Sequence, residues 1–322
     1  MTLHTSASGV AGESCSSASN TTRYTVNDFV FRVHGLNRHT TNLALLKYHD
    51  FQGFLVTGQN SGTHWIKWML SHALAHRYGV EPPRYFNNDS SNDLIGHPKH
   101  ERIHPHLPRI ASSHSIPAYA VDWAWLRKIR RPPPYAVVVR DVRDVLISNY
   151  EKWRTEYGVP FSRYVPGDPR GKAFVCDVWW YMRFMNRWGD IARRHPRETL
   201  VLRYEDFRKD PLENMRRLAR HFRLDLSDTD LLAGVAVGSK EYMMARQDPQ
   251  ITERPIRPDG VEGARFSARD LEVLAGILSR NLKHDFGYRY FAEPRGFQIS
   301  PAARNEPRRT SGSATATVRD AA

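Results

Sequence analysis

Short apolar runs alternate with longer segments of helical periodicity through the middle of the chain. Candidate strands lie at 54–57, 109–113, 135–139 and 199–202, of which 109–113 is short and more polar. The run at 135–139 is continuously apolar, as expected for a strand buried on both faces of a parallel sheet. Apolar residues recur at helical spacing over 62–77, along 142–153, and in segments that begin at Pro211 and Ser267. This alternation predicts one α/β domain, a three-layer α/β/α arrangement around a central parallel sheet.

Composition divides the chain into a globular middle and two atypical ends. Residues 1–22 are rich in Ser, Thr, Ala and Gly, and residues 293–322 in Arg, Ala, Ser and Pro, which predicts disordered tails around a domain at 23–292. The N-terminus lacks a basic region followed by an apolar one, and no apolar run reaches the length of a membrane span. Cys15 and Cys176 are the only cysteines, which excludes a disulfide framework. We therefore expect a soluble, cytoplasmic protein.

The chain carries a formal net charge of +13. Such an excess favours an anionic partner, namely nucleic acid, an acidic membrane surface or a nucleotide with several phosphates, and it does not choose among them. A solvated basic surface without a specific role is the simplest alternative. No helix-turn-helix or RNA-binding signature accompanies the charge, so no nucleic-acid partner is expected.

The most informative turn joins the run at 54–57 to the helix that follows. It extends from Gly58 to Gly62, and it predicts an anion cradle because the first N–H groups of a helix lack partners and the helix dipole favours negative charge. The turn departs from a Walker A loop, since the two glycines are one residue too close and Thr63 stands where its lysine belongs, so an ATPase or kinase is disfavoured. Phosphate or sulfate binding is the first hypothesis, and a plain strand-to-helix turn is the alternative.

A second candidate anion site follows the buried run at 135–139. Arg140 comes directly after this run, and Ser148 lies two turns along the next helix. An arginine there presents a fork of donors to a phosphate, to which a hydroxyl adds one more. The alternative is a structural ion pair between Arg140 and either Asp141 or Asp144.

These two sites together resemble a known family. The residues SGTHW at 61–65 resemble the 5′-phosphosulfate loop of the sulfotransferases, and RDVRDVLISNY at 140–150 resembles their 3′-phosphate motif. The residues YED at 204–206 are similar to the segment that comes next in that family. The resemblance covers roughly residues 50–290 and implies a P-loop-like α/β fold.

The resemblance implies an activity and a donor. Sulfotransferases move a sulfuryl group from 3′-phosphoadenosine-5′-phosphosulfate (PAPS) to an acceptor hydroxyl or amine without a metal, and release 3′-phosphoadenosine-5′-phosphate (PAP). The residues implied around the phosphosulfate are Ser61, Gly62, Thr63 and His64. Trp65 is implied to lie against adenine, although a tryptophan at a helix start is commonly a core residue.

The remaining nucleotide contacts implied by the resemblance come from later segments. Arg140 and Ser148 are implied to hold the 3′-phosphate, with Tyr204 near the base. Ser239, in the sequence GSKEYM, resembles a further nucleotide contact.

His114 is the candidate catalytic base. The sequence SHSIP at 113–117 resembles the family arrangement in which a histidine follows a short strand, and a histidine with a pKa near neutrality suits removal of the acceptor proton. A metal cluster is the less favoured alternative for other histidines, because the group lacks helical or zinc-finger spacing and no cysteine joins it. That group is His97, His100, His104 and His106.

Two positions depart from the family pattern. Asn60 stands where the family carries a lysine that neutralises charge on the leaving phosphate, and loss of one such electrostatic donor costs a few kcal/mol in a transition state. His64 or Lys67 is a candidate substitute. Near Gly260 and Gly263 the family's basic pair is displaced, which leaves Arg257 as the candidate contact to the 3′-phosphate. A catalytically impaired PAPS- or PAP-binding module is therefore the alternative function.

The acceptor is predicted to be a small molecule held by irregular segments. Residues 81–108 and 154–174 lack clear periodicity, and insertions at the carboxyl edge of such a sheet usually shape the substrate pocket. Aromatic residues in this part of the chain suggest a pocket for a phenol, a sugar ring or an apolar molecule, with a core role as the alternative. They are Trp153, Tyr157, Trp179, Trp180 and Tyr181. No dimer signature defines the oligomeric state.

Overall fold

The computed structural model describes residues 25–34, 43–48, 50–86, 89–96, 99, 101–251 and 263–290. The predicted tails at 1–22 and 293–322 lie outside these residues. The candidate nucleotide contact Arg257 also lies outside them. In the described part of the chain, no helix has the length and apolar character that crossing a membrane requires.

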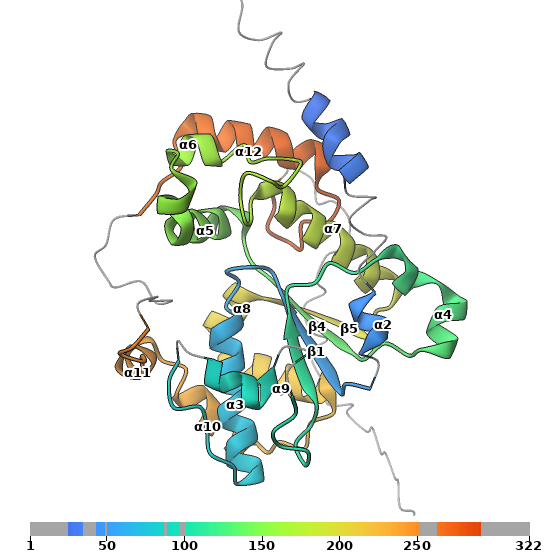
Figure 1. Ribbon diagram of the computed structural model, residues 1–322, viewed down its shortest axis with the longest axis vertical. Helices are drawn as coiled ribbons and strands as arrows, with labels where there is room; N and C mark the ends of the chain where they lie inside the picture. Colours follow the sequence, from blue (N-terminus) through green and yellow to red (C-terminus); the bar gives the residue numbers. More distant parts are fainter. Residues whose placement is uncertain are drawn as a thin grey trace, which may run out of the picture.

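Five parallel strands form one sheet in the order β2-β3-β1-β4-β5 (Figure 1). Their bounds are β1 Gly53–Thr57, β2 Ile95–Gly96, β3 Ile110–Ser113, β4 Tyr135–Val139 and β5 Thr199–Arg203. In the register of the central strands, Phe54 of β1 lies opposite Ala111 of β3 and Tyr135 of β4. Because every pair is parallel, the carboxyl ends of all these strands meet at one edge of the sheet.

Helices connect the strands and cover both faces of the sheet (Figure 1). Residues 25–34 are helical, and the α-helices that follow are α2 Ala44–Lys47, α3 Thr63–Tyr78, α4 Ala124–Ile129, α5 Val142–Tyr157, α6 Phe161–Tyr164, α7 Val178–Arg194, α8 Tyr204–Lys209, α9 Pro211–Phe222, α10 Asp228–Ala236, α11 Lys240–Ala245 and α12 Ala268–Asn281. Two 3-10 turns, η1 Asp89–Asp93 and η2 Tyr119–Asp122, lie on either side of β3 in the sequence.

Successive residues of each strand point to opposite layers. Phe54 and Val56 of β1 belong to the core that the sheet shares with α5, α7 and α12, whereas Leu55 belongs to the core shared with α3 and α9. Strands buried on both faces explain why their sequences are continuous apolar runs rather than alternating ones. The predicted three-layer α/β fold is confirmed.

The sequence missed the longest helix of the described chain. Helix α7 lies over the sheet and has a clear apolar stripe, although buried charged residues such as Arg183, Arg187 and Asp190 lie among its apolar ones. The first strand predicted after 57, at 109–113, is present as β3, while β2 was not predicted. It is only two residues long.

Helices α3 and α10 pack so closely that one position admits no side chain. A Cβ atom added to Gly234 of α10 would lie 2.3 Å from the carbonyl oxygen of Met69 on α3. We expect Gly234→Ala to lower the free energy of unfolding by about 1–3 kcal/mol, because backbone must move to relieve the clash. Chemical denaturation measures this loss.

The matched control is Gly276→Ala in α12, where the nearest atom to an added Cβ is the Arg280 guanidinium at 3.5 Å. This variant is expected to be unchanged or up to about 1 kcal/mol more stable, since alanine favours helix. Equal denaturation midpoints for the wild type and Gly234→Ala would contradict the close packing of α3 and α10.

Candidate active site

Four sequence motifs follow neighbouring strands and therefore meet at one edge of the sheet. The turn at 58–62 follows β1, His114 follows β3, Arg140 follows β4 and Tyr204 follows β5. In an open parallel sheet, this carboxyl edge is where ligands bind. The topology thus places the two candidate anion sites and the candidate base next to one another.

The turn between β1 and α3 adopts a backbone that few residues tolerate. Asn60 has φ 57°, and Gly62 has φ 84°, so both lie in the left-handed region. Asparagine is among the side chains most tolerant of this region, and glycine has no steric penalty there. A Cβ atom on Gly62 would also approach the Tyr204 ring to 2.7 Å. The glycine is therefore required both by the turn and by the aromatic ring beside it.

Helix α3 begins without a side-chain cap. Its N-cap residue is Gly62, whereas several of the other helices begin with a capping side chain from an aspartate or a serine, as at Asp141 of α5 and Ser267 of α12. The first N–H groups of an uncapped helix remain available to an external acceptor, and an aspartate cap would repel an anion. The start of α3 therefore has the chemistry of an anion site.

The hydroxyl of Ser61 points into the protein rather than toward this opening. Ser61 is fully buried, and its hydroxyl hydrogen-bonds to the phenol of Tyr181 on α7. The Tyr181 hydroxyl donates in turn to the carbonyl of Gln59, at 2.7 Å, so Ser61 is the donor in the first bond. Tyr181 was predicted to line an acceptor pocket, and in the structure it supports the turn from beneath.

Arg140 joins the two candidate anion sites. Its guanidinium donates to the carbonyl oxygen of Asn60 at 2.8 Å and to the hydroxyl of Ser148 at 3.3 Å. It also lies over the ring of Tyr204, 4.6 Å from the ring centre. The Nε atom of Arg140 is buried and has no hydrogen-bond partner among the described residues. That donor remains available for an anion.

The alternative pairing of Arg140 with a neighbouring carboxylate does not occur. Asp141 instead accepts from Arg143, whose Nε lies 3.0 Å from the carboxylate, and it caps α5 through the Arg143 N–H. Glu205, which the sequence did not single out, accepts the N–H of Asp141 at 3.1 Å and the hydroxyl of Tyr288 at 2.5 Å. The start of α5 is thus held in place without using Arg140.

The side chain of Asn60 is tethered as a neutral group. Its amide donates to the side-chain oxygen Oδ1 of Asn149 at 3.0 Å, and Asn149 is fully buried on α5. Asn149 donates to the carbonyl of Cys176 at 2.6 Å and to the hydroxyl of Tyr164 at 3.0 Å. These partners come from distant parts of the chain, so the sequence offered no signal for them.

Trp65 contacts the segment that carries Ser239. Its indole N–H donates to the carbonyl of Gly238 at 2.8 Å, and its ring meets the ring of Tyr204 edge-on with centroids 5.8 Å apart. Trp65 also contacts Phe207, so it is partly a core residue. The hydroxyl of Ser239 accepts the N–H of Tyr242 at 3.1 Å and caps α11. Tyr204, Trp65 and the start of α11 therefore form one side of the site.

His114 lies at the end of β3 beside the start of the turn. Its Nδ1 is 2.8 Å from the carbonyl oxygen of Thr57 and 3.2 Å from the hydroxyl of Thr57, which also contacts the Thr63 hydroxyl. A carbonyl oxygen only accepts hydrogen bonds, so Nδ1 carries the proton in the neutral ring. The other nitrogen, Nε2, then holds the lone pair that a general base requires.

The surroundings of His114 favour its neutral form. The side chain keeps an exposed face, but the protein around it removes solvation, and this desolvation lowers its pKa below the usual 6.5. The positive charges of Lys152 and Lys67 lower the pKa further, while the hydrogen bond to Thr57 acts in the opposite direction. The imidazole is therefore unprotonated at neutral pH.

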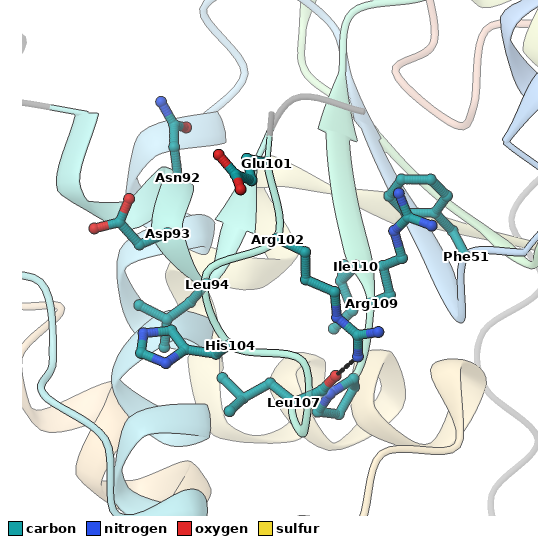
Figure 2. Close-up of a pocket in the computed structure, with 12 residues that line it drawn as sticks. Phe51, Asn92, Asp93, Leu94, Glu101, Arg102, His104, Leu107, Arg109 and Ile110 are labelled. Carbon is teal, nitrogen blue, oxygen red and sulfur yellow. Dashed lines mark hydrogen bonds between the residues drawn. The ribbon is translucent and has the colours of Figure 1, made fainter. Parts of the chain in front are cut away.

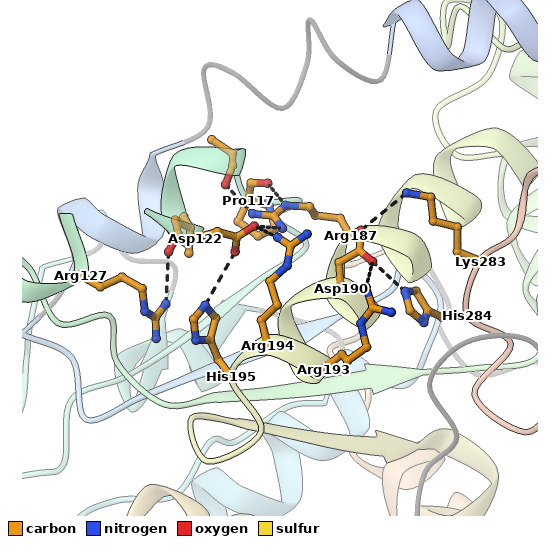
Figure 3. Close-up of polar contacts among 12 residues, drawn as sticks. Pro117, Asp122, Arg127, Arg187, Asp190, Arg193, Arg194, His195, Lys283 and His284 are labelled. Atoms are coloured by element: carbon orange, nitrogen blue, oxygen red, sulfur yellow. Dashed lines mark hydrogen bonds and ion pairs between the residues drawn. The ribbon is translucent and has the colours of Figure 1, made fainter. Parts of the chain in front are cut away.

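Helix α7 fixes the segment that follows His114. The indole of Trp188 donates to the carbonyl of Ser115 at 3.0 Å. The guanidinium of Arg187 donates to the carbonyl of Pro117 at 2.9 Å (Figure 3) and to that of Ala118 at 2.7 Å. Arg187 is only 1% exposed. A buried arginine that satisfies carbonyls far away in sequence cannot be recognised from local spacing.

The aromatic residues proposed for an acceptor pocket divide between core and surface layers. Trp179 and Tyr181 are fully buried, and Trp179 packs against Phe31 with centroids 5.2 Å apart. Tyr157 stacks on Tyr164 at 5.4 Å. The core interpretation is correct for the buried pair.

A small cavity lies elsewhere, beside the edge strand β2 and its neighbour β3 (Figure 2). It measures about 40 Å³ and is lined by residues that include Phe51, Asp93, Glu101, His104 and Arg109. This volume is far below that of pockets that enclose a substrate. Within the described residues, no three or more His, Cys, Asp or Glu side chains gather as for a metal, and His97 and His100 lie outside them.

Comparison with known proteins identifies the family. The family model described as "Sulfotransferase domain" matches residues 50–253, and the chain belongs to this family. A "Flavonol sulfotransferase-like" protein of Flaveria bidentis is 25% identical over 198 residues, which cover 56% of this chain and 60% of that protein. The match thus spans less than two thirds of the length of that relative.

The fold has a counterpart among solved structures. The crystal structure of mouse sulfotransferase SULT7A1 complexed with PAP superimposes with a TM-score of 0.50 at 14% sequence identity. The match covers 77% of this chain and 91% of the mouse chain. At this identity, the similarity establishes a shared fold.

The desolvated environment of His114 predicts how the residue titrates. In an NMR titration, we expect the ring protons of His114 to report a pKa below 6.5. The signal of His114 is identified by its absence from the spectrum of His114→Asn. Removing a nearby positive charge in Lys67→Met or Lys152→Met is expected to raise this pKa by a few tenths of a unit, because the cation disfavours imidazolium. Lys128→Met, on the distant helix α4, is the control. A His114 pKa of 6.5 or above would contradict the desolvated environment.

Proposed function

We propose that this protein is a PAPS-dependent sulfotransferase that transfers a sulfuryl group to a hydroxyl or amine of a small-molecule acceptor. The observation that supports it most is the hydrogen bond from Arg140 to the carbonyl of Asn60, which unites the two candidate anion sites at one sheet edge. Membership of the sulfotransferase domain family points to the same chemistry.

Donor binding is assigned to two groups of residues. The phosphosulfate would lie at the uncapped start of α3, against the backbone N–H groups of Gly62, Thr63 and His64. The 3′-phosphate would take the free Nε donor of Arg140 together with the hydroxyl of Ser148. The unpartnered Nε donor of Arg140 and the uncapped start of α3 lie close together, which suits a ligand that carries phosphates at two positions.

The adenine side of the donor is assigned to the aromatic residues beside these donors. Tyr204 lies under the Arg140 guanidinium, and Trp65 meets the Tyr204 ring edge-on. Trp65 is anchored through Gly238 next to Ser239, which brings that segment to the same side. These contacts support base stacking or edge contact near Tyr204.

His114 acts as the general base in this proposal. Its Nε2 takes the proton from the acceptor hydroxyl or amine as that atom attacks sulfur. The new bond to sulfur forms while the bond from sulfur to the 5′-phosphate oxygen breaks, and the electron pair of that bond leaves with PAP. The Nδ1–H bond to Thr57 holds the ring in the tautomer this step needs.

Charge on the leaving phosphate needs compensation that Asn60 does not provide. Lys67 lies four residues after Thr63, on the same face of α3, and it is nearly buried beside Asn92. Its charge reaches His114, as its effect on the histidine pKa indicates. We assign Lys67 and the dipole of α3 to this compensation, and His64 is the exposed alternative.

A catalytically impaired PAPS- or PAP-binding module is the second candidate function. The hydrogen bond from the neutral Asn60 amide to Asn149 favours this candidate. A donor that is already bonded within the protein does not stabilise charge on the leaving phosphate in the transition state. The two candidates agree on nucleotide binding and differ only in turnover.

Transfer of radiolabelled sulfate from PAPS to a panel of phenols, sugars and amines tests the proposal. We expect transfer by the wild type and a loss of at least about a hundredfold in His114→Gln, because general-base catalysis contributes about that much. Calorimetry should show PAP affinity unchanged within about twofold in the variant, since His114 lies outside the phosphate contacts.

The rate for the wild type should rise with pH through a midpoint below 6.5, because the lowered pKa makes the neutral imidazole available there. Full turnover in His114→Gln would remove this residue from the mechanism. PAP binding by the wild type without transfer to any acceptor would favour the impaired module.

Selection of the 3′-phosphate gives a separate test. Wild-type protein should bind PAP more tightly than adenosine 5′-monophosphate, and Arg140→Met should lose about a hundredfold in PAP affinity with a much smaller loss for the monophosphate. Arg143→Met is the matched control, because Arg143 is exposed and pairs with Asp141. If both variants weakened the two nucleotides equally, Arg140 would be a brace of the loop and not a 3′-phosphate contact.

A further inference from the structure

The short helix α4 carries an exposed apolar surface that the proposed activity does not use. Trp123, Trp125 and Ile129 are 52%, 58% and 68% exposed. The two indole rings stack with centroids 5.9 Å apart and an interplanar angle of 25°, and Ile129 lies one helical turn after Trp125 on the same face. We call these three residues the aromatic patch.

Basic residues surround the aromatic patch. Some exposed cations lie within or just after the patch in the sequence, and others come from the end of α7 and the turn beyond it. The end of α7 lies beside η2, because Arg194 forms an ion pair with Asp122. This basic rim comprises Lys128, Arg130, Arg131, Arg194 and Arg197. The carboxylates nearest in the chain are already paired, Asp122 with Arg187 and Arg194, and Glu198 with Arg127. The surroundings of the patch are therefore positively charged.

Residues next to the patch in the sequence, Asp122 and Arg127, are held by several polar contacts (Figure 3). Asp122, at the last position of η2, accepts from the buried Arg187 at 2.9 Å and from Arg194. Arg127 of α4 donates to the carbonyl of Val121 at 3.2 Å and lies 3.5 Å from Glu198. These bonds hold the backbone segment that carries the two indoles.

We propose that the aromatic patch and its basic rim dock the protein on an anionic phospholipid surface. Indole rings favour the boundary between lipid headgroups and acyl chains, and Ile129 adds aliphatic area to the same face. Lysines and arginines next to the indoles are attracted to acidic headgroups. An apolar anchor together with a basic cluster supplies the two signals that reversible membrane attachment needs.

Other occupants fit the surface less well. Each indole already has one face against the other, so the pair offers few free faces to successive bases of a nucleic acid. A second copy that paired patch to patch would bring two basic rims together and repel itself. An acidic lipid surface can bury the apolar face of the patch and attract the positive charges of the basic rim.

The position of the patch leaves the candidate active site open. Helix α4 precedes β4, and its partner Glu198 directly precedes β5, so the patch lies toward the amino ends of the strands. The turn at 58–62, His114 and Arg140 lie at the carboxyl ends. A protein docked through α4 therefore presents its candidate catalytic edge away from the lipid, to dissolved donor and acceptor.

Vesicle co-sedimentation of the full chain tests the docking. We expect binding to equimolar phosphatidylcholine and phosphatidylglycerol, weak binding to phosphatidylcholine alone, and release at high salt. The double variant Trp123→Ala with Trp125→Ala should lower the partition coefficient by about tenfold or more. Lys128→Glu with Arg131→Glu should lower it on acidic vesicles only.

The matched control removes exposed apolar side chains elsewhere, in Leu232→Ala with Leu271→Ala, which are 52% and 43% exposed. This variant should bind vesicles as the wild type does, and PAP affinity should be unchanged in every variant. Trp fluorescence of the wild type should shift to the blue on acidic vesicles, and the shift should be absent without Trp123 and Trp125.

Four results would overturn the proposal. The first is failure of the wild type to bind acidic vesicles, and the second is equal binding by the double tryptophan variant. The third is a dimer in light scattering that the double tryptophan variant abolishes, and the fourth is RNA binding that depends on the same residues, since either of these would assign the patch to another partner. None of these results bears on sulfuryl transfer, which is measured separately.

Discussion

The hydrogen bond between the Arg140 guanidinium and the Asn60 carbonyl is the contact on which the site depends. Strands β1 and β4 are neighbours and parallel, so the turn after one lies beside the residue that follows the other. The bond uses one guanidinium N–H and leaves Nε unpaired above the Tyr204 ring. One residue thus shapes the turn and retains a donor for an anion, which couples the form of the loop to binding.

Much of this arrangement was predictable because it follows from local patterns and sheet topology. The apolar run at 135–139 gives β4 with the same bounds, since a strand buried on both faces permits no polar interruption. Arg140 and Ser148 are separated by two helical turns, which brings the hydroxyl back to the guanidinium. Tyr204 approaches them because β5 pairs with β4 and the strands end at one edge.

The parts that were missed depend on partners far apart in the sequence. Tyr181 was assigned to an acceptor pocket, but it hydrogen-bonds beneath the turn to residues about 120 positions earlier. Arg187 is buried because carbonyls of Pro117 and Ala118 satisfy it. Helix α7 has a clear apolar stripe, but the aromatic residues of its first turn were attributed to an acceptor pocket, so the helix that fixes both the turn and the segment after His114 was not predicted.

Asn60 is best understood from its backbone and from the charge of its neighbours. Its φ of 57° suits asparagine better than lysine, and its amide satisfies the buried Asn149. A lysine at this position would also place a second cation beside Arg140, whose guanidinium contacts the carbonyl of the same residue. With the amide, the turn keeps its form before any anion arrives, and positive charge is distributed over Arg140, Lys67 and the start of α3. In the proposed reaction, compensation of the charge on the leaving phosphate would depend on how these three groups are placed and not on one side chain of the loop.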